Sequence, residues 1–169
     1  MSSPRILFLC TGNAARSVMA GAALAARLPQ VVVETAGTLS IDGQPMSWRT
    51  RAALQAHGLV ADRHRSRQAT PGHLDAATLV IGLAPEHVKW VRRTHPAAAA
   101  RTATLKRLCR ELAIDERPLA ARVAELDLAT VELEDWEEVV DPGGGDADAF
   151  VACADEVVPL IDELARRLR

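Results

Sequence analysis

The sequence predicts an α/β fold built on a parallel sheet, because short apolar runs alternate with longer helix-favouring segments over its 169 residues. The first run, "RILFLC" at 5–10, has the continuous apolar character of a strand that is buried on both faces. The last segment has apolar residues at helical spacing, with acidic residues early and arginines late. Strands that alternate with helices are joined by right-handed crossovers, which give a parallel sheet with helices on both faces.

Four segments are expected to form the strands. After 5–10 come "VVVETAGT" at 31–38, which ends in a glycine turn, and "AATLVIGL" at 76–83. A fourth strand is expected near Thr102 to Leu105. The third segment, like the first, is expected to be a buried strand.

Helices are expected between the strands and at the end of the chain. The segment 17–28 is rich in alanine and leucine and stops before a proline. The segment 47–58 has Ser47 as its N-cap and Gly58 as its stop. A shorter helix at 84–93 is acidic in its first turn and basic in its last, which suits the helix dipole. The apolar residues that share one face of the last helix are Phe150, Ala154, Val157, Ile161, Leu164 and Leu168.

Composition and charge argue against several classes of protein. A net charge of -2 gives no reason to expect binding to nucleic acid or to anionic membranes. No apolar run approaches the roughly 20 residues that a membrane-spanning helix needs, and the first residues lack the order of a secretory signal. We expect a cytoplasmic protein with a single domain at 1–169, monomeric or weakly dimeric, whose arginine- and alanine-rich composition is typical of a bacterium. The acidic and arginine-rich segment 111–138 is expected to be a surface insertion.

The cysteines and histidines predict neither a disulfide framework nor a metal site. Cys10, Cys109 and Cys153 are odd in number and widely spaced, without a CxxC pair. We expect reduced thiols, with Cys109 and Cys153 as inert core residues. The histidines have no metal-ligand spacing with one another or with a cysteine, so no metal or other cofactor is expected.

The stretch "CTGNAARS" at 10–17 carries the strongest chemical signal. It joins the carboxyl end of the first strand to the first helix, which is where ligands bind in parallel α/β folds. Backbone amides at such a junction can surround an anion, and Gly12 is expected to allow close approach with a positive φ. Arg16 can offer two donors to a tetrahedral oxyanion. The same positive field would favour the thiolate of Cys10.

Simpler interpretations of Cys10 are a small buried side chain or a redox thiol. For a lone cysteine the buried role would be preferred. Here a cysteine, an arginine and a hydroxyl lie within eight residues at a strand-to-helix junction, which favours a nucleophile that handles phosphate. The absence of a following GK[ST] argues against a nucleoside-triphosphate loop.

The loop resembles the signature of low-molecular-weight protein tyrosine phosphatases, which are related to protein arginine phosphatases and thioredoxin-coupled arsenate reductases. The resemblance extends to "ETAGT" at 34–38, "AHG" at 56–58, "HRSRQ" at 64–68, "TLK" at 104–106 and "DP" at 141–142. It implies a four-stranded parallel sheet flanked by helices, with the phosphate-binding loop between the first strand and the first helix. It also implies a phosphorylated protein or peptide as the substrate.

By this resemblance, Cys10 attacks phosphorus and forms a phosphocysteine, which splits hydrolysis into two easier steps. The loop amides and Arg16 hold the phosphoryl oxygens, and Ser17 donates a hydrogen bond to the cysteine sulfur. The residues expected to bind phosphate are Thr11, Gly12, Asn13, Ala14, Ala15, Arg16 and Ser17.

The resemblance also implies a supporting network and a general acid. Asn13 would hold the loop in its strained shape, with Thr35 and His64 as network partners. Asp141 would protonate the leaving oxygen and then activate water, which predicts a bell-shaped pH profile. Taken alone, His64 could be an exposed basic residue and Asp-Pro a turn. The family pattern around each of them favours the functional interpretation.

Three other activities are weighed against tyrosine phosphatase. An arsenate reductase of this family needs partner thiols after the third strand, where "IGLAPEHVKWV" has no cysteine. A module that only binds phosphate would need neither Cys10 nor Asp141. A protein arginine phosphatase agrees with Thr11 and with a glycine-rich segment after "DP".

The leaving group is the harder question. Tyrosine phosphatases of this family usually place aromatic residues after the "DP" and in the loop after the second strand. This chain has three glycines, 143–145, at the first place and Ile41 near the second. Arginine phosphatases usually carry an aromatic residue directly after the proline, which Gly143 lacks. We predict phosphotyrosine as the first substrate and phosphoarginine as the alternative.

Overall fold

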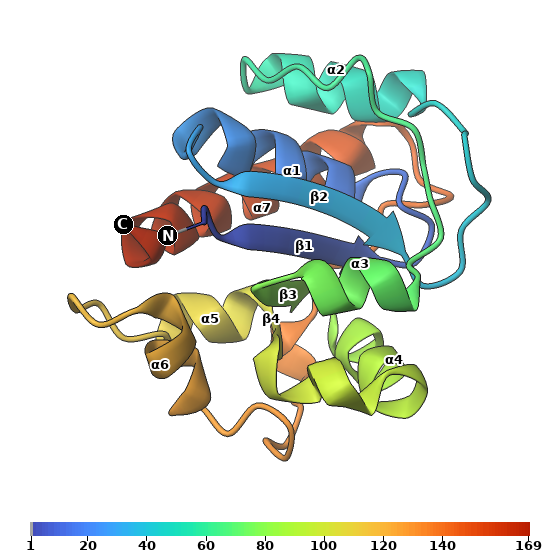
Figure 1. Ribbon diagram of the computed structural model, residues 1–169. Helices are drawn as coiled ribbons and strands as arrows, with labels where there is room; N and C mark the ends of the chain where they lie inside the picture. The colour runs from blue at the N-terminus through green and yellow to red at the C-terminus, as the bar shows by residue number, and fades with distance from the viewer. Residues whose placement is uncertain (1) are drawn as a thin grey trace.

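The computed structural model describes residues 2–169 and has a four-stranded parallel sheet at its centre (Figure 1). The strands are β1 (Arg5–Cys10), β2 (Val32–Gly37), β3 (Leu79–Gly82) and β4 (Thr102–Thr104). Their spatial order is β2-β1-β3-β4, and every neighbouring pair is parallel. The predicted fold class and the four predicted strands are confirmed.

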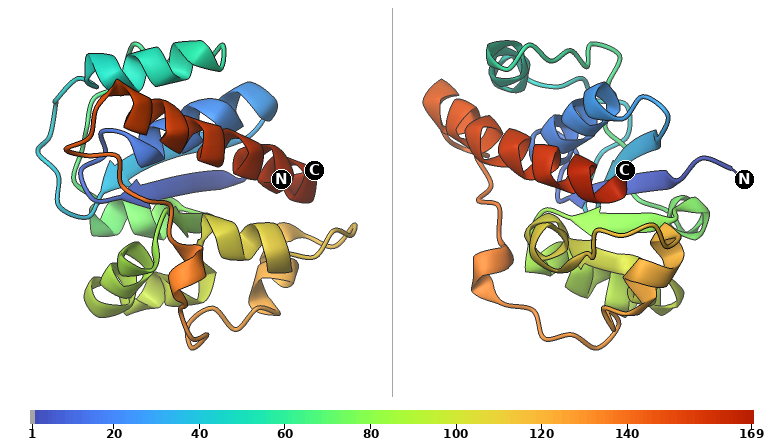
Figure 2. Two further views of the ribbon diagram at one scale, coloured as in Figure 1. Left: turned by 180° about the vertical axis from the view of Figure 1, so that it is seen from behind. Right: turned by 90° about the vertical axis from the view of Figure 1, so that its left-hand side faces the viewer.

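Helices cover both faces of the sheet, and alternate residues of β1 pack into the two layers. Ile6 and Phe8 belong to the larger apolar cluster, whereas Leu7 and Leu9 belong to the smaller one. The larger layer contains α1 (Arg16–Arg27), α2 (Trp48–Ala56), α5 (Leu105–Glu111) and α7 (Ala147–Leu168). The smaller layer contains α3 (Pro71–Ala76), α4 (Pro85–Thr94) and the 3-10 turn η1 (Pro96–Arg101). Figure 2 shows α7 lying beside α1 over the sheet.

The ends of the predicted helices follow their local chemistry. The Ser47 side chain accepts a hydrogen bond from the backbone N–H of Thr50 and caps α2, and Gly58 has a φ of 68° just beyond its end. All the apolar positions predicted for one face of α7 are buried, apart from Leu168 near its end, which is half-buried. Helix α3 was not predicted. It begins at a Thr70 cap in which His73 supplies the reciprocal hydrogen bond.

The segment 111–138 follows the outer side of the molecule and contains α6 (Leu119–Ala124) and the 3-10 turn η2 (Asp135–Glu137). It is more than a surface excursion, because Val123, Leu128 and Glu137 are buried. Within residues 2–169, no helix has the length and apolar character needed to cross a bilayer.

The carboxyl ends of the parallel strands lie at one edge of the sheet. Hydrogen bonds at this edge fix the segment around Val139, which is distant in sequence. The Leu83 N–H donates to the Leu9 carbonyl over 3.0 Å, and the Val139 N–H donates to the Leu83 carbonyl over 2.8 Å. The residues that precede α7 are therefore fixed beside the ends of β1 and β3, where a ligand site is expected.

Candidate active site

A cavity of about 290 Å³ lies at this edge, at the end of β1. Cys10 ends the strand, and Arg16 begins α1 after a five-residue loop. The residues that line the cavity are Cys10, Gly12, Ala14, Ala15, Arg16, Ser47, Thr50, Asp141, Gly143 and Phe150. The structure thus brings the predicted nucleophile, the predicted anion-binding arginine and the predicted general acid to one cavity.

The Cys10 thiol has a fixed hydrogen-bonding partner. Its Sγ lies 3.0 Å from the Ser17 Oγ, and both residues are buried. The Asn13 Nδ2 donates to the same Ser17 oxygen over 2.9 Å. A thiolate at Cys10 can only accept, so with Cys10 ionised the Ser17 hydroxyl donates to the sulfur while its oxygen accepts from Asn13, and this bond stabilises the thiolate.

The loop adopts its special conformation at Asn13. Asn13 has a φ of 54°, whereas Gly12 is not among the residues with positive φ, so the expectation for Gly12 was wrong. Asparagine tolerates this left-handed region better than most residues. Its Oδ1 accepts from the Arg67 N–H over 3.0 Å, and its carbonyl oxygen lies 2.8 Å from the His64 Nε2. Asn13 is completely buried, and these contacts together hold the loop.

The supporting network differs from the expected one at Thr35. Within residues 2–169, the Thr35 side chain makes no hydrogen bond to Asn13. Instead its backbone carbonyl accepts from the Arg67 Nε over 2.9 Å, and Arg67 in turn bonds Asn13. Arg67 is the link that the sequence analysis missed, although it lies in the quoted "HRSRQ". Burial lowers the pKa of His64, so its neutral ring donates from Nε2 to the Asn13 carbonyl.

Gly37 at the end of β2 allows the loop to pack this closely. A Cβ at this position would lie 2.5 Å from the Thr11 carbonyl oxygen and 3.1 Å from the Asn13 nitrogen. Any larger residue would have to displace loop backbone.

Four consecutive amides of the loop are left for an anion. In the described part of the chain, the backbone N–H groups of residues 12–15 donate to no protein acceptor. They precede the first turn of α1, whose dipole favours negative charge at this end. A tetrahedral oxyanion above Cys10 would satisfy these donors.

Arg16 is buried and connects both sides of the cavity. Its Nη1 donates to the Val139 carbonyl over 3.0 Å. Its Nη2 lies 3.6 Å from the Asp141 Oδ2 and 3.8 Å from the Glu86 Oε1. The guanidinium is therefore flanked by two carboxylates, both mostly exposed at the mouth.

The Asp141 carboxylate is oriented by the turn that follows it. Its Oδ1 accepts from the Gly143 N–H over 2.9 Å, which leaves Oδ2 directed to Arg16. A Cβ at position 143 would lie 3.0 Å from the same Oδ1. Glycine at this position thus keeps the space beside the carboxylate open.

Glu86 and His87 are site residues that the sequence analysis did not identify. The Thr11 Oγ1 donates to the Glu86 Oε1 over 3.3 Å and lies 3.1 Å from the His87 Nε2. Because the single hydroxyl proton of Thr11 goes to Glu86, the His87 Nε2 donates to the Thr11 oxygen, and the unprotonated Nδ1 has no partner within residues 2–169. Burial and then the charge of Arg16 lower the pKa of His87 to about 3, which keeps the ring neutral. The sequence offered one indication of Glu86 and His87. They follow shortly after β3, and the carboxyl ends of parallel strands lie at the edge where ligands bind.

The other two cysteines are not activated. Burial raises the pKa values of Cys109 and Cys153 to about 12, so both remain protonated at neutral pH. This agrees with the prediction that they are inert core thiols.

The chain matches the family model described as low molecular weight phosphotyrosine protein phosphatase over residues 5–120. A protein-arginine-phosphatase from Geobacillus stearothermophilus is 34% identical over 166 residues, which cover 98% of this chain and 96% of that protein. A low molecular weight protein-tyrosine-phosphatase from Streptomyces coelicolor is 32% identical over 160 residues, which cover 90% of this chain and 86% of that protein.

The fold is similar to that of solved structures as well. The arginine phosphatase structure from Geobacillus stearothermophilus superposes with a TM-score of 0.78 at 33% identity. The superposition covers 98% of this chain and 92% of that chain. The similarity to this arginine phosphatase therefore covers nearly the whole chain, including the segment between residue 120 and α7.

Proposed function

Because the chain belongs to the low molecular weight phosphotyrosine protein phosphatase family, we propose that it hydrolyses phosphorylated protein side chains through a phosphocysteine at Cys10. The contact that carries the proposal is the 3.0 Å distance between the Cys10 Sγ and the Ser17 Oγ, at the base of the loop. A buried cysteine with this partner beside free loop amides is built to attack a bound phosphoryl group.

In the first step, the thiolate attacks phosphorus and an S–P bond replaces the bond to the leaving atom. Arg16 and the amides of residues 12–15 hold the phosphoryl oxygens as charge spreads over them. Asp141 gives its proton to the leaving oxygen or nitrogen, so the side chain leaves as a neutral group.

In the second step, the ionised Asp141 takes a proton from a water molecule, and that water attacks the phosphocysteine. The S–P bond breaks, inorganic phosphate leaves and the thiolate is restored. Ser17 stabilises the sulfur as leaving group in this step, through the hydrogen bond that it offers to the thiolate.

Phosphotyrosine is the substrate class that the family suggests. Phosphoarginine is the second candidate, because two carboxylates, from Glu86 and Asp141, flank Arg16 at the mouth. A guanidine leaving group presents several N–H donors to such carboxylates, whereas a phenol ring gains more from apolar walls. The arginine phosphatase from Geobacillus stearothermophilus also matches nearly the whole chain.

The phosphatase proposal is tested with p-nitrophenyl phosphate and three variants. Cys10→Ser should abolish turnover, and Asp141→Asn should lower kcat by about 100-fold or more, as loss of a general acid does. Cys109→Ser is the matched control and should retain wild-type activity, because its thiol lies in the core near α7. Wild-type activity no higher than that of Cys10→Ser would refute the proposal.

The substrate class is decided by phosphate release from two peptides that differ only in the modified residue. One carries phosphotyrosine and the other phosphoarginine, and kcat/KM is compared. A higher value for either peptide assigns the preference. Turnover of neither peptide, with p-nitrophenyl phosphate still cleaved, would restrict the enzyme to small phosphate esters.

The proposed chemistry needs a reduced Cys10, and none of the cysteines forms a disulfide. We propose a reducing compartment, the cytoplasm of a bacterium, as the place of action.

A further inference from the structure

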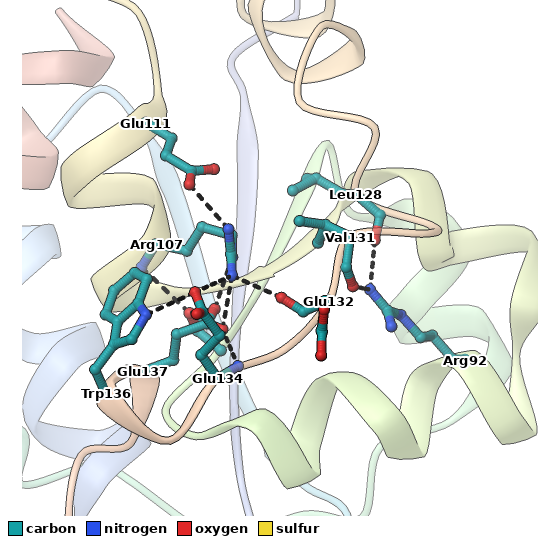
Figure 3. A network of polar contacts seen from close by, with 10 residues as sticks. Arg92, Arg107, Glu111, Leu128, Val131, Glu132, Glu134, Trp136 and Glu137 are labelled. Atoms are coloured by element: carbon teal, nitrogen blue, oxygen red, sulfur yellow. Dashed lines mark hydrogen bonds and ion pairs between the residues drawn. The ribbon is translucent and has the colours of Figure 1, made fainter.

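Glu137 forms an ion pair with Arg107 inside the protein (Figure 3). Neither residue lines the Cys10 cavity. Glu137 is completely buried. Its Oε1 accepts from the Arg107 Nε over 2.8 Å and from the Thr104 Oγ1 over 2.7 Å. Its Oε2 accepts from the Arg107 Nη2 over 2.9 Å and from the Glu134 N–H over 2.7 Å. The carboxylate is thus fixed by four hydrogen bonds from three directions.

Arg107 is held equally firmly by its other contacts. Its Nη1 donates to the Glu111 Oε1 over 2.9 Å, and its Nη2 donates to the Glu132 carbonyl over 2.8 Å. The Trp136 ring lies over this guanidinium at 5.4 Å and over that of Arg110 at 3.7 Å. Hydrogen bonds from Arg107 and Thr104 outweigh the effect of burial, which alone would raise the pKa of Glu137, and leave that pKa lowered. Both partners are therefore charged at neutral pH.

The pair lies on the segment that leads to Asp141. Directly after Glu137, the Glu138 carbonyl accepts from the Lys106 Nζ over 2.6 Å. Val139 then bonds Leu83 through its N–H and Arg16 through its carbonyl. Three consecutive residues of this segment are therefore fixed to the rest of the protein, and the exposed Asp141 follows two residues later.

Stability is a poor explanation for such a pair. Taking two charges out of water costs about as much free energy as their attraction returns. Apolar residues of similar volume often stabilise the folded protein equally well. A fully satisfied buried pair instead selects one position of the chain. Here the position selected is that of the segment carrying Asp141.

We propose that Thr104, Lys106 and Arg107 form a clamp on Glu137 and Glu138, and that this clamp positions Asp141 over the leaving group. Glu137 and Arg107 are positioning residues, because neither touches the cavity that holds Cys10. The inference rests on the proposed function, in which Asp141 is the general acid. It gives the segment 111–138 a role, since the segment supplies Glu137 and Glu138 to the clamp.

The test is a double-mutant cycle with phenyl phosphate, whose phenol is a poor leaving group that needs protonation. Glu137→Gln should lower kcat/KM by about tenfold or more, because a general acid displaced by about 1 Å loses much of its effect. In the Asp141→Asn background the same substitution should lower kcat/KM by less than about twofold, since no acid remains to be positioned. Equal losses in both backgrounds would overturn the inference.

Two further variants keep the test decisive. Lys106→Met removes the hydrogen bond to the Glu138 carbonyl at a partly exposed position, so it should fold even if Glu137→Gln does not. Lys106→Met should lower kcat/KM in the wild-type background and have little effect on it in the Asp141→Asn background. Equal losses of kcat/KM in the two backgrounds would again overturn the proposed clamp. Glu125→Gln is the matched control, because it removes an exposed partner of Arg117 in the same segment. It should leave kcat/KM unchanged.

Failure of the inference is distinguishable from failure of the proposed function. If Asp141→Asn alone does not lower kcat/KM, the proposed general acid is wrong. If it does, and the effect of Glu137→Gln is independent of it, only the clamp is wrong.

Discussion

The Nη2 atom of Arg16 lies 3.6 Å from the Oδ2 atom of Asp141. One residue begins the first helix, and the other lies in the turn before the last. Val139 makes this approach possible, because its carbonyl accepts from the Arg16 Nη1. Arg16, which is proposed to hold phosphate, is therefore hydrogen-bonded to the same segment that carries Asp141, the proposed general acid.

Replacing Ser17 by alanine should reduce activity without unfolding the protein. The hydrogen bond from the Ser17 hydroxyl to the Cys10 sulfur would be lost. Bonds to charged groups contribute about 1.5 to 3 kcal/mol, so kcat should fall roughly 10- to 100-fold. The rate of Cys10 alkylation by iodoacetamide near neutral pH should fall as well. Thr94→Ala, which removes an exposed hydroxyl from α4, is the control. An unchanged alkylation rate in Ser17→Ala would show that Ser17 does not stabilise the thiolate.

Replacing Gly37 by alanine should distort the loop. The new Cβ would lie 2.5 Å from the Thr11 carbonyl oxygen and 2.7 Å from the Ser40 Cβ. We expect the free energy of unfolding in urea to fall by about 1 to 3 kcal/mol, as overpacking usually costs, and activity to fall further. Gly72→Ala is the matched control, because its nearest neighbour would be 3.7 Å away in a helix. It should be neutral or stabilising by up to about 1 kcal/mol. Equal stabilities of the two variants would contradict the close packing of Gly37.

The fold was predictable because its signals are local. Apolar runs identified β1, β2 and β3, and the Ser47 cap and the spacing on α7 identified two of the helices. The short helix α3 has too few residues for a periodic pattern, so its Thr70 cap alone could not identify it.

The site was predictable only in part, because side-chain contacts depend on packing between distant segments. Cys10 and Arg16 were predicted from the loop at 10–17, Asp141 was predicted from a resemblance, and the structure brings the three together. Arg67 replaces the expected Thr35 side chain as the partner of Asn13, since the route of 64–68 past the loop decides which group reaches it. Glu137 is acidic in sequence yet fully buried, which no local pattern indicates.

Replacing Glu86 by glutamine should change substrate preference more than general activity. The Glu86 carboxylate lies 3.8 Å from Arg16 at the mouth and is mostly exposed. Its attraction for a guanidine leaving group should be about 1 kcal/mol, as for other exposed pairs. The kcat/KM ratio of phosphoarginine peptide to phosphotyrosine peptide should therefore fall roughly fivefold. Glu125→Gln, an exposed carboxylate away from the mouth, should leave the ratio unchanged. An unchanged ratio in Glu86→Gln would exclude Glu86 from leaving-group recognition.

His87 should make the protein less stable in acid. An unfolded histidine binds a proton near pH 6.5, whereas burial and the charge of Arg16 lower the pKa of His87 to about 3 in the folded state. Between these values the unfolded chain binds more protons, so the free energy of unfolding falls as the pH falls, by up to about 1.4 kcal/mol per pH unit. Arg16 and Glu86 face the ring, and neither supplies a partner for its Nδ1.

His87→Gln should remove this contribution and keep a donor toward Thr11. The difference in the free energy of urea unfolding between wild type and variant is measured from about pH 7 to about pH 4. Wild type should lose stability relative to the variant at each step below about pH 6.5. His64 and His73 also have lowered pKa values, but both are present in the two proteins and cancel in the difference. Parallel stability curves would mean that folding does not lower the pKa of His87, and the effect of burial and Arg16 on the ring would then be wrong.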